Sequence, residues 1–324
     1  MKPTLLHLKS CRRVLVASHV NPDGDAIGSL IAMGLALKSL GKEVTMYNES
    51  PIPAVYQFLP AIDRIVSRVA DFAAYDTAVI LDCGNLQRVG DAGRAIETIG
   101  TVVNIDHHVT NNGFGDLQYI DTEACASAEL VYRLIRELGV TISEAMAWSL
   151  YTGILTDTGS FRFSNTNRAA FAISEEMLTI GVDPWMVAQY VYGTYSLGRI
   201  KLLNLALDTI ELAHDGKVSL MTVTRRMLEK TGTRPEDADG MINYARGIEE
   251  VRLAVLIQQN GNGGPSANGN GPYHVSLRSD GSVDAAAIAA AFGGGGHASA
   301  AGFNVEAMSL AELKARILEL TTDL

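Results

Sequence analysis

The sequence predicts an α/β protein, with an open parallel sheet in the N-terminal domain and a smaller mixed α/β domain after it. Three observations predict this fold class. Short apolar runs rich in β-branched residues alternate with helix-length segments in the first part of the chain, an alternation typical of βαβ units. Further on, an Asp-Gly pair separates two apolar runs, as in a β-hairpin. The length of 324 residues favours two domains over one hydrophobic core.

The predicted N-terminal sheet contains four apolar runs that are short enough to be buried strands. The first run leads into a long apolar segment, 25–40, which we expect to be a helix closed by Gly41. Residues 124–196 are mostly helical in character, and Asp157 falls near the end of one of these helices. The strand candidates are Arg13–His19, Glu43–Asn48, Thr77–Gly84 and Thr101–His108.

The predicted organisation is an N-terminal domain over residues 1–195, a helical linker over 196–208 and a C-terminal domain over 209–324. The C-terminal domain opens with the hairpin at Asp215-Gly216. Residues 260–271 are almost without apolar side chains, so we expect a mobile surface loop there.

Composition excludes several classes of protein. The net charge of −10 argues against a protein that tracks along long nucleic acid, because such binding depends on many Lys and Arg contacts. The three cysteines, Cys11, Cys83 and Cys125, are far apart and are expected to be free, buried thiols. Basic residues interrupt the short apolar stretch at the N-terminus, so we expect neither a signal peptide nor a membrane anchor, and a cytoplasmic location.

Four clusters of acidic and histidine residues stand out. Three of them directly follow predicted strands, and the carboxyl ends of parallel strands meet at one edge of a sheet. Each cluster alone also fits a turn, a helix cap or a packed histidine. Only their combination indicates a site. The clusters are His19 with Asp23 and Asp25, then Asp82, then Asp106 with His107 and His108, and finally Asp157.

Five aspartates and three histidines in one crevice would repel one another unless cations neutralised them. Oxygen and imidazole ligands without thiolate favour manganese or magnesium, with iron, cobalt or zinc as alternatives. The ligands are too many for one ion. Two ions about 3.5–4 Å apart, bridged by a carboxylate, are the arrangement that activates water for phosphoryl transfer.

A glycine run near the C-terminus is a second candidate site. Residues 293–296 are four consecutive glycines, whose backbone N–H groups can approach an anion closely, and His297 follows them. Arg278, in a strand-like segment, is a candidate second cation for the same phosphate. Alone, the glycines would equally fit a flexible turn, and the arginine a surface residue.

Together these motifs resemble the DHH phosphoesterases with a C-terminal DHH-associated domain of the first type. Within that family they are most similar to the bifunctional nanoRNase and pAp phosphatases, where pAp is 3′-phosphoadenosine 5′-phosphate. The resemblance spans nearly the whole chain, and residues 260–271 depart from the family's compact pattern. The motifs are SHVNPDGDAIGS (18–29), LDCG (81–84), NIDHH (104–108), LTDTGSF (155–161) and GGGGHASAAG (293–302).

The resemblance implies a role for each candidate residue. Asp82 would bridge the two ions, Asp106 would orient a ligand histidine, and His108 would contact the scissile phosphate or protonate the leaving oxygen. One ion would be held by His19, Asp23 and Asp82, and the other by Asp25, Asp82, His107 and Asp157. The far end of the substrate would be gripped by Arg278, Gly294, Gly295, Gly296 and His297.

The implied activity is hydrolysis of short RNA of about two to five nucleotides to 5′-mononucleotides, and of pAp to AMP, by two-metal chemistry. The resemblance also implies two divalent cations, manganese first, a homodimer, and an active site in the cleft between the domains. Long duplex nucleic acid and membranes are not expected partners. A cyclic or linear dinucleotide phosphodiesterase is the nearest alternative, followed by a RecJ-like exonuclease and a pyrophosphatase. A nucleotide-binding sensor without catalysis is the alternative outside the enzymes.

Overall fold

The computed structural model describes residues 1–193, 195–259, 270–322 and 324. By its internal contacts the chain divides into two compact units, Met1–Thr194 and Tyr195–Leu324. Each unit contains one six-stranded sheet, which confirms the predicted α/β class. Among the helices in these ranges, none has both the length and the apolar character that a membrane span requires.

The sheet of the first unit is entirely parallel, as predicted. Its strands are β1 (Arg13–Ser18), β2 (Glu43–Tyr47), β3 (Ile65–Val66), β4 (Thr77–Leu81), β5 (Val102–Asp106) and β6 (Leu117–Ile120). The strand order is β3-β2-β1-β4-β5-β6, so the winding of the chain reverses between β1 and β4. All residues of β4 and β5 are buried, which agrees with their nearly continuous apolar sequences.

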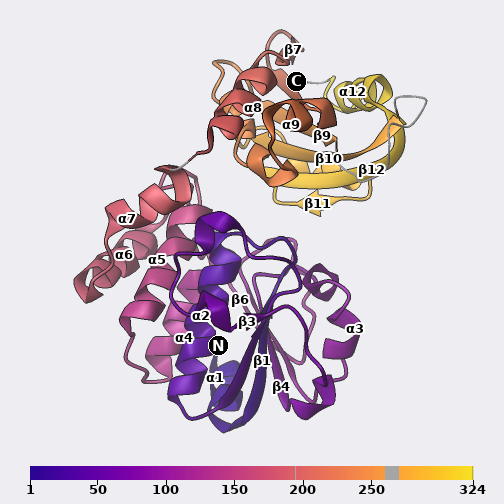
Figure 1. Cartoon of the computed structure of the whole chain (residues 1–324). Coiled ribbons are helices and arrows are strands. Elements are labelled where there is room, and N and C mark those ends of the chain that lie inside the picture. The colour runs from indigo at the N-terminus through magenta and orange to yellow at the C-terminus, as the bar shows by residue number, and fades with distance from the viewer. Residues whose placement is uncertain (194, 260–269, 323) are drawn as a thin grey trace. The chain divides into compact units, whose positions relative to one another are not determined.

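Helices cover both faces of this sheet. The helices of the unit are α1 (Lys2–Ser10), α2 (Gly24–Ser39), α3 (Gly93–Ile96), α4 (Ser127–Glu137), α5 (Glu144–Asp157), α6 (Arg168–Ile180) and α7 (Pro184–Ala188), with short turns η1 (Ala54–Tyr56), η2 (Ile62–Arg64), η3 (Phe72–Ala74), η4 (Leu86–Val89) and η5 (Gln189–Gly193). Helices α2, α4 and α5 lie on one face, and α3 and η4 lie on the other (Figure 1). Gly41, at φ +77°, ends α2 in the left-handed conformation predicted for it.

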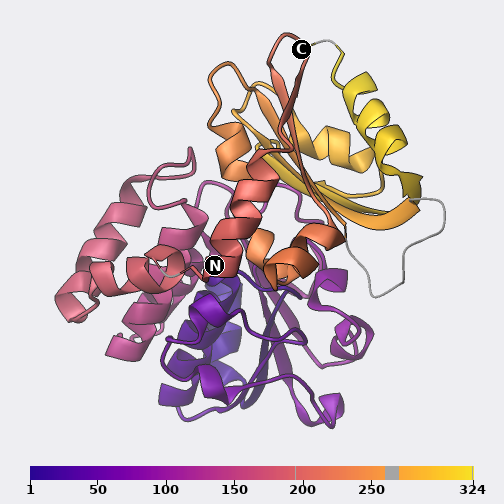
Figure 2. The ribbon, with the colours of Figure 1, turned by 45° about the horizontal axis from the view of Figure 1, so that its top comes forward.

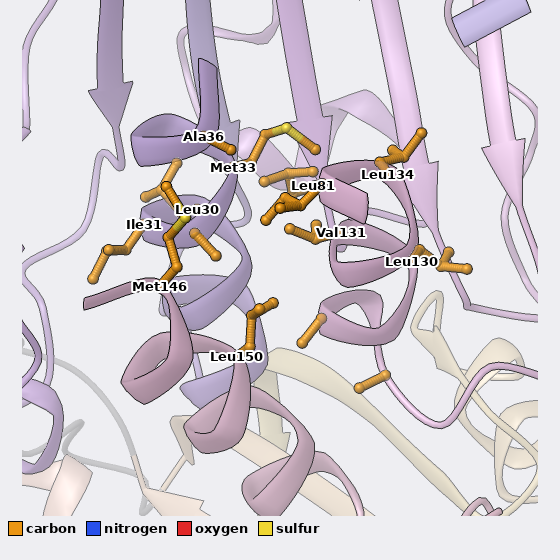
Figure 3. Packing of buried hydrophobic residues seen from close by; sticks show 14 of the residues in the cluster. Leu30, Ile31, Met33, Ala36, Leu81, Leu130, Val131, Leu134, Met146 and Leu150 are labelled. Atoms are coloured by element: carbon orange, nitrogen blue, oxygen red, sulfur yellow. The ribbon is translucent and has the colours of Figure 1, made fainter. Parts of the chain in front are cut away.

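The core between the sheet and α2, α4 and α5 holds these helices against one face of the sheet. Leu30 of α2, Leu134 of α4 and Leu150 of α5 are fully buried and pack near Leu81 of β4 (Figure 3). Burying each such side chain stabilises the fold by about 1.5–3 kcal/mol. Helices α2 and α5 are also in close contact, because a Cβ atom at Gly28 would lie only 2.2 Å from the carbonyl oxygen of α5 residue 149.

The second unit contains both helices and a sheet, as predicted for a smaller α/β domain, and the sheet has parallel and antiparallel strand pairs. Its strands are β7 (Glu211–Ala213), β8 (Val218–Val223), β9 (Leu253–Gln259), β10 (Asn270–Ser279), β11 (Gly295–Gly296) and β12 (Ala300–Ser309). They lie in the order β11-β12-β10-β9-β8-β7, and only β8 and β9 are parallel neighbours. Strands β7 and β8 form the predicted hairpin, with Asp215 and Gly216 at positive φ between them.

Helices flank both faces of this second sheet (Figure 2). The helices of the unit are α8 (Leu197–Leu207), α9 (Arg225–Thr231), η6 (Pro235–Ala238), α10 (Ile242–Arg246), α11 (Ala285–Ala290) and α12 (Leu310–Glu319). The segment predicted as a linker contains α8, whose Leu202 and Ala206 are fully buried in the core of this unit. Of the loop predicted over 260–271, residues 260–269 lie outside the described part of the chain. The loop prediction was wrong for Asn270 and Gly271, which begin β10.

Candidate metal centre

The acidic and histidine residues of the first unit gather at one edge of its parallel sheet. His19 directly follows β1, Asp82 directly follows β4, and Asp106 is the last residue of β5. These strands are neighbours, and the winding reverses between β1 and β4. In open α/β sheets, ligands bind beyond the carboxyl ends of the strands at such a reversal. The predicted convergence of these side chains is confirmed by the short distances between them.

Two helices bring three further aspartates to the same edge. Asp23 caps the N-terminus of α2, where its Oδ1 accepts a hydrogen bond from the backbone N–H of Ala26 at 3.0 Å. Asp25 lies in the first turn of that helix and is buried. Asp157 is the last residue of α5, at the helix end where the sequence predicts it.

A first group of candidate ligands consists of His19, Asp23 and Asp82, whose ligand atoms all lie within 4.8 Å of one another. Nε2 of His19 lies 3.4 Å from Oδ2 of Asp82 and 4.0 Å from Oδ1 of Asp23. Nδ1 of His19 lies 2.9 Å from the carbonyl oxygen of Val20 and donates to it, so Nε2 faces the carboxylates. A backbone acceptor that sets the tautomer in this way is usual for metal-binding histidines.

A second group consists of Asp25, His107 and Asp157, within the same 4.8 Å limit. Nε2 of His107 lies 3.6 Å from Oδ2 of Asp157 and 3.7 Å from Oδ1 of Asp82. Its Nδ1 lies 3.3 Å from the carbonyl oxygen of Ala124. His107 therefore turns one nitrogen toward the backbone and the other toward the aspartates, as His19 does.

Asp82 lies between these groups. Its Oδ2 faces His19, while its Oδ1 faces both His107 and His108, the latter with Nδ1 at 3.6 Å. The side chain is only 2% exposed, and the backbone is in the left-handed region at φ +58°. Aspartate tolerates this conformation better than most residues, but it is uncommon outside glycine. A buried carboxylate whose two oxygens face two ligand groups is suited to bridging two cations.

Asp106 contacts His108 rather than one of the two histidines expected to bind metal, His19 and His107. It is fully buried, and its Oδ1 accepts a hydrogen bond from Nδ1 of His108 at 2.7 Å. Its Oδ2 accepts a second hydrogen bond from Nδ2 of Asn111 at 2.6 Å. We expected Asp106 to orient a metal-binding histidine, and in the structure it orients the histidine that we expected to face the phosphate.

Burial and mutual charge shift the pKa values of the cluster strongly. Burial alone would raise the pKa of Asp82, but its contact with His19 and the charges of its other histidine neighbours hold it well below its usual range. Burial would lower the pKa of His107, yet the surrounding carboxylates, Asp157 first, raise it to about 9. Burial raises the pKa of Asp157 to about 7, and it also raises that of Asp25.

These residues fit divalent cations. The buried carboxylates carry like charges, and in the protein without metal burial and their mutual repulsion raise the pKa values of Asp25 and Asp157 and so favour protonation. The donors are oxygen and imidazole nitrogen, as manganese and magnesium accept. Burial raises the pKa of the adjacent Cys83 thiol far above its ordinary value, and Cys83 belongs to none of the candidate ligand groups in the described part of the chain.

The phosphate-binding candidates of the second unit also lie together. Gly295 and Gly296 form β11 and pair with Gly302 and Ala301 of β12. On the other side of β12, Arg278 of β10 pairs with Ala300. The glycines and the arginine therefore flank the first residues of one strand.

Gly294 and Gly296 of the glycine run cannot be replaced by larger residues without backbone movement. A Cβ atom at Gly294 would lie 2.3 Å from the carbonyl oxygen of Gly302. At Gly296, φ is +144° and a Cβ atom would lie 2.5 Å from the carbonyl oxygen of Ala300. The N–H of His297 donates to the carbonyl oxygen of Ala300 at 2.7 Å, which closes a tight turn after the run.

Comparison with known proteins agrees with both halves of the fold. The family model "DHH family, N-terminal domain" matches residues 13–154, and the "DHHA1 domain" model matches residues 216–323. The chain is 35% identical over 309 residues to the bifunctional oligoribonuclease and PAP phosphatase NrnA of Thermus thermophilus, which covers 94% of this chain and 88% of that relative. The chain belongs to the DHH family. Of its candidate metal ligands, only Asp157 lies beyond the end of the first match.

Other DHH-family proteins are similar over most of the chain. The NrnA protein of Bacillus subtilis, also a bifunctional oligoribonuclease and PAP phosphatase, is 26% identical over 90% of this chain and 89% of its own length. The crystal structure of an exopolyphosphatase-related protein from Bacteroides fragilis superimposes with a TM-score of 0.88 at 27% identity. It covers 99% of this chain and 95% of the other.

Three residues that support the site of this DHH-family chain were not predicted from the sequence. Asn165 donates from Nδ2 to Oδ2 of Asp157 at 3.1 Å, and Asn111 donates to Asp106. Ser127, the first residue of α4, donates from Oγ to Oδ1 of Asp82 at 2.9 Å. The two asparagines carry no sequence signal, whereas Ser127 opens a recognisable helical segment, where a hydroxyl residue is common.

Proposed function

We propose that this chain is a metal-dependent phosphoesterase that hydrolyses short oligoribonucleotides to 5′-mononucleotides and pAp to AMP. The observation that carries the proposal is the position of Asp82, whose two carboxylate oxygens face two groups of candidate ligands. The relatives that match nearly the whole chain carry both of these activities in their names. The substrate class is proposed from that similarity.

Two divalent cations are the proposed cofactors, with manganese first and magnesium, cobalt or iron as alternatives. When bound, such a pair activates water and stabilises the charge that develops on a transferring phosphoryl group. One ion would be held by His19, Asp23 and Asp82. The other would be held by Asp25, Asp82, His107 and Asp157. Asp25, His107 and Asp157 form one group of candidate ligands, and Oδ1 of Asp82 lies 3.7 Å from Nε2 of His107 in that group.

His108 is the proposed proton donor to the leaving ribose oxygen. Burial alone would lower the pKa of His108, but its hydrogen bond to Asp106 and the charge of Asp82 raise it. Its Nδ1 is held by Asp106, so the ring orientation is set before substrate arrives. A general acid that is protonated and pre-oriented in this way contributes about 10²–10⁴-fold to the rate of such reactions.

The second unit is proposed to bind the other end of the substrate. Arg278 is partly buried, and burial together with the neighbouring charge of Arg246 lowers its pKa, so an anion would stabilise its charged form. Backbone N–H groups of Gly295 and Gly296, with His297, would hold a phosphate. The N–H of Gly294, which the sequence also suggested for this role, donates instead to the carbonyl oxygen of Ala289 at 2.9 Å.

The proposed partners are short RNA and small phosphorylated nucleotides, and we also propose a homodimer. The net charge of −10 supports the exclusion of long duplex nucleic acid. Cys11, Cys83 and Cys125 are free and buried, which supports a reducing, cytoplasmic location.

The test is a hydrolysis panel with purified full-length protein that has been stripped of metal and reloaded with manganese. The substrates are 5′-labelled RNA of two to five nucleotides, a 24-nucleotide RNA, pAp and cyclic di-AMP. Asp82→Asn removes the bridging charge while keeping the side-chain shape. Asp63→Asn, at an exposed aspartate of the same unit, is its matched control.

Mononucleotide from the short RNA and phosphate from pAp, lost in Asp82→Asn and kept in Asp63→Asn, are the expected results. Preferred opening of the cyclic dinucleotide would replace the proposal with a dinucleotide phosphodiesterase. A protein that binds manganese and a nucleotide but hydrolyses none of the panel would instead be a sensor.

A further inference from the structure

The first turn of α4 touches two carboxylates of the candidate metal centre at once. The backbone N–H of Ser127 donates to Oδ2 of Asp25 at 2.6 Å, and the N–H of Ala128 donates to Oδ1 of Asp25 at 2.9 Å. The hydroxyl of the same Ser127 donates to Oδ1 of Asp82 at 2.9 Å. All of these residues are buried. One serine therefore connects an aspartate of α2 with the aspartate that follows β4.

The contact to Asp82 restrains how its carboxylate can rotate. Oδ2 of Asp82 faces His19 at 3.4 Å, and Oδ1 faces Nε2 of His107 at 3.7 Å. Rotation about the bond to the carboxylate group would move both oxygens out of these directions together. The hydroxyl of Ser127 donates a hydrogen bond to Oδ1 of Asp82. A serine hydroxyl keeps its proton at every relevant pH, so this contact does not depend on pH.

The start of α4 is held firmly in its place. Glu129, in the same turn, is fully buried and accepts a hydrogen bond from the N–H of Cys125 at 2.8 Å. Further along, Leu130, Val131 and Leu134 are completely buried in the core with α2 and α5 (Figure 3). Since a packed core resists displacement, the hydroxyl of Ser127 has a fixed position relative to β4. The positive end of the helix also favours the negative charge of both aspartates.

We propose that Ser127 is a positioning residue, which sets the orientation of the Asp82 carboxylate so that its two oxygens can serve two cations. The inference rests on the two-cation site of the proposed function. Loss of the hydroxyl frees Oδ1, the oxygen on the side of His107 and Asp157. The affinity for the cation on that side should fall most, and the affinity for the cation near His19 and Asp23 should fall least.

The test compares three variants with the wild-type protein. Ser127→Ala removes the hydroxyl but keeps the backbone N–H that binds Asp25. Ser127→Thr restores a hydroxyl. Ser149→Ala is the matched control, because Ser149 is also a fully buried helical serine, but its hydroxyl donates only to the carbonyl oxygen of Ala145 at 2.9 Å.

Manganese binding is measured by titration calorimetry, and the spin coupling between two bound ions by electron paramagnetic resonance. Thermal unfolding of the metal-free proteins shows that each variant is folded. We expect Ser127→Ala to bind the second ion about 10–100-fold more weakly and to lose the coupled signal, as is usual when a hydrogen-bond partner of a metal ligand is removed. Ser127→Thr should recover at least part of the coupled signal, and Ser149→Ala should behave as wild type.

Two tight, spin-coupled ions in Ser127→Ala would overturn the inference. Equal losses in Ser127→Ala and Ser149→Ala would also overturn it, because the effect would then be one of general packing. Neither readout needs a substrate. A wild-type protein that binds two coupled ions yet hydrolyses neither short RNA nor pAp would refute the proposed function. The role of Ser127 would still be decided by the manganese titration of Ser127→Ala.

Discussion

Nδ1 of His108 lies 2.7 Å from Oδ1 of Asp106, and the other oxygen of that carboxylate is held by Asn111 at 2.6 Å. The carboxylate is fully buried, so it has little freedom to rotate toward another hydrogen-bond partner. The imidazole of His108 is therefore fixed in direction and stabilised in its charged form. A buried carboxylate that orients a histidine and sets its tautomer is a recurrent device in hydrolase sites.

Asp106→Asn is predicted to lower kcat by about 10–100-fold with little change in KM, because the proton donor loses its orientation. The pH profile should shift as well. The carboxylate raises the pKa of His108, so its removal lowers that pKa, and His108 loses its proton at a lower pH. The alkaline fall of kcat, measured between pH 6 and 9, should therefore begin earlier.

Asp116→Asn is the control for this variant. Asp116 accepts a hydrogen bond from the N–H of Val102 at 2.8 Å, at the opposite end of β5 from Asp106. It should leave the position of the alkaline limb unchanged. An Asp106→Asn enzyme with full kcat and an unmoved limb would show that His108 is not the proton donor.

Manganese affinity is predicted to rise with pH. In the metal-free protein the pKa of His107 is raised to about 9 and that of Asp157 to about 7, so both hold protons that a cation must displace. As the pH is lowered below 9, the apparent manganese affinity should fall about tenfold per pH unit, because the cation must displace the proton on His107. Below pH 7 it should fall more steeply, because Asp157 is then protonated as well. Calorimetric titrations at pH 6, 7 and 8, in buffers of different ionisation enthalpy, count the released protons. An affinity that is constant over this range would contradict the assignment of these ligands.

Gly153→Ala is predicted to disturb the metal centre from inside α5. A Cβ atom at Gly153 would lie 2.8 Å from Cβ of Ala128 and 2.9 Å from Oδ1 of Asp25. Overpacking of this kind costs about 1–3 kcal/mol of unfolding free energy. Manganese binding should weaken too, because Asp25 and the first turn of α4 are pushed apart. Denaturant unfolding and manganese titration measure the two effects.

Gly34→Ala is the matched control for Gly153→Ala. It is also a helical glycine, and its new Cβ atom would lie 2.4 Å from Sδ and 2.6 Å from Cγ of Met46, a buried side chain outside the metal centre. Both variants gain about 0.5–1 kcal/mol from better helix propensity and both overpack the core, so a loss of manganese affinity in Gly153→Ala alone reports its contact with Asp25. If both variants bind manganese as tightly as wild type, close approach at residue 153 is not needed for the site.

Arg278→Ala is predicted to raise KM for short RNA and pAp by about 10–100-fold, the loss expected for a hydrogen bond to a charged group. The value of kcat at saturation and the manganese affinity should stay near wild type, because the residue belongs to the second unit. Arg252→Ala, at an exposed arginine of the same unit, is the control and should leave KM unchanged. A fall in kcat with constant KM would place Arg278 in the chemical step instead.

Much of the candidate site could be predicted because its ligands follow strands. His19, Asp82 and Asp106 come directly after apolar runs, and a parallel sheet brings the ends of such runs to one edge whatever the details of packing. Asp157 was harder to place, since the end of a helix meets the sheet edge only if the helix has the right length and tilt. Its segment still has the pattern of a helix that ends there.

The supporting contacts could not be predicted, for a physical reason. Ser127 meets Asp82 across 45 residues of sequence and Asp25 across 102 residues. These contacts depend on where α4 begins to within one residue and on side-chain direction, and periodicity specifies neither. The partner of Asp106 depends in the same way on the rotamer of His108, because two adjacent histidines were open to it.

The strand order has a practical meaning for protein engineering. The strands that lead into the site, β1, β4 and β5, occupy interior positions of the sheet, while the two-residue β3 forms one border. Grafted segments or affinity tags inserted beside β3 would therefore be separated by β2 from β1, the nearest strand that leads into the site. A variant library meant to alter the chemistry belongs instead at the ends of the three interior strands.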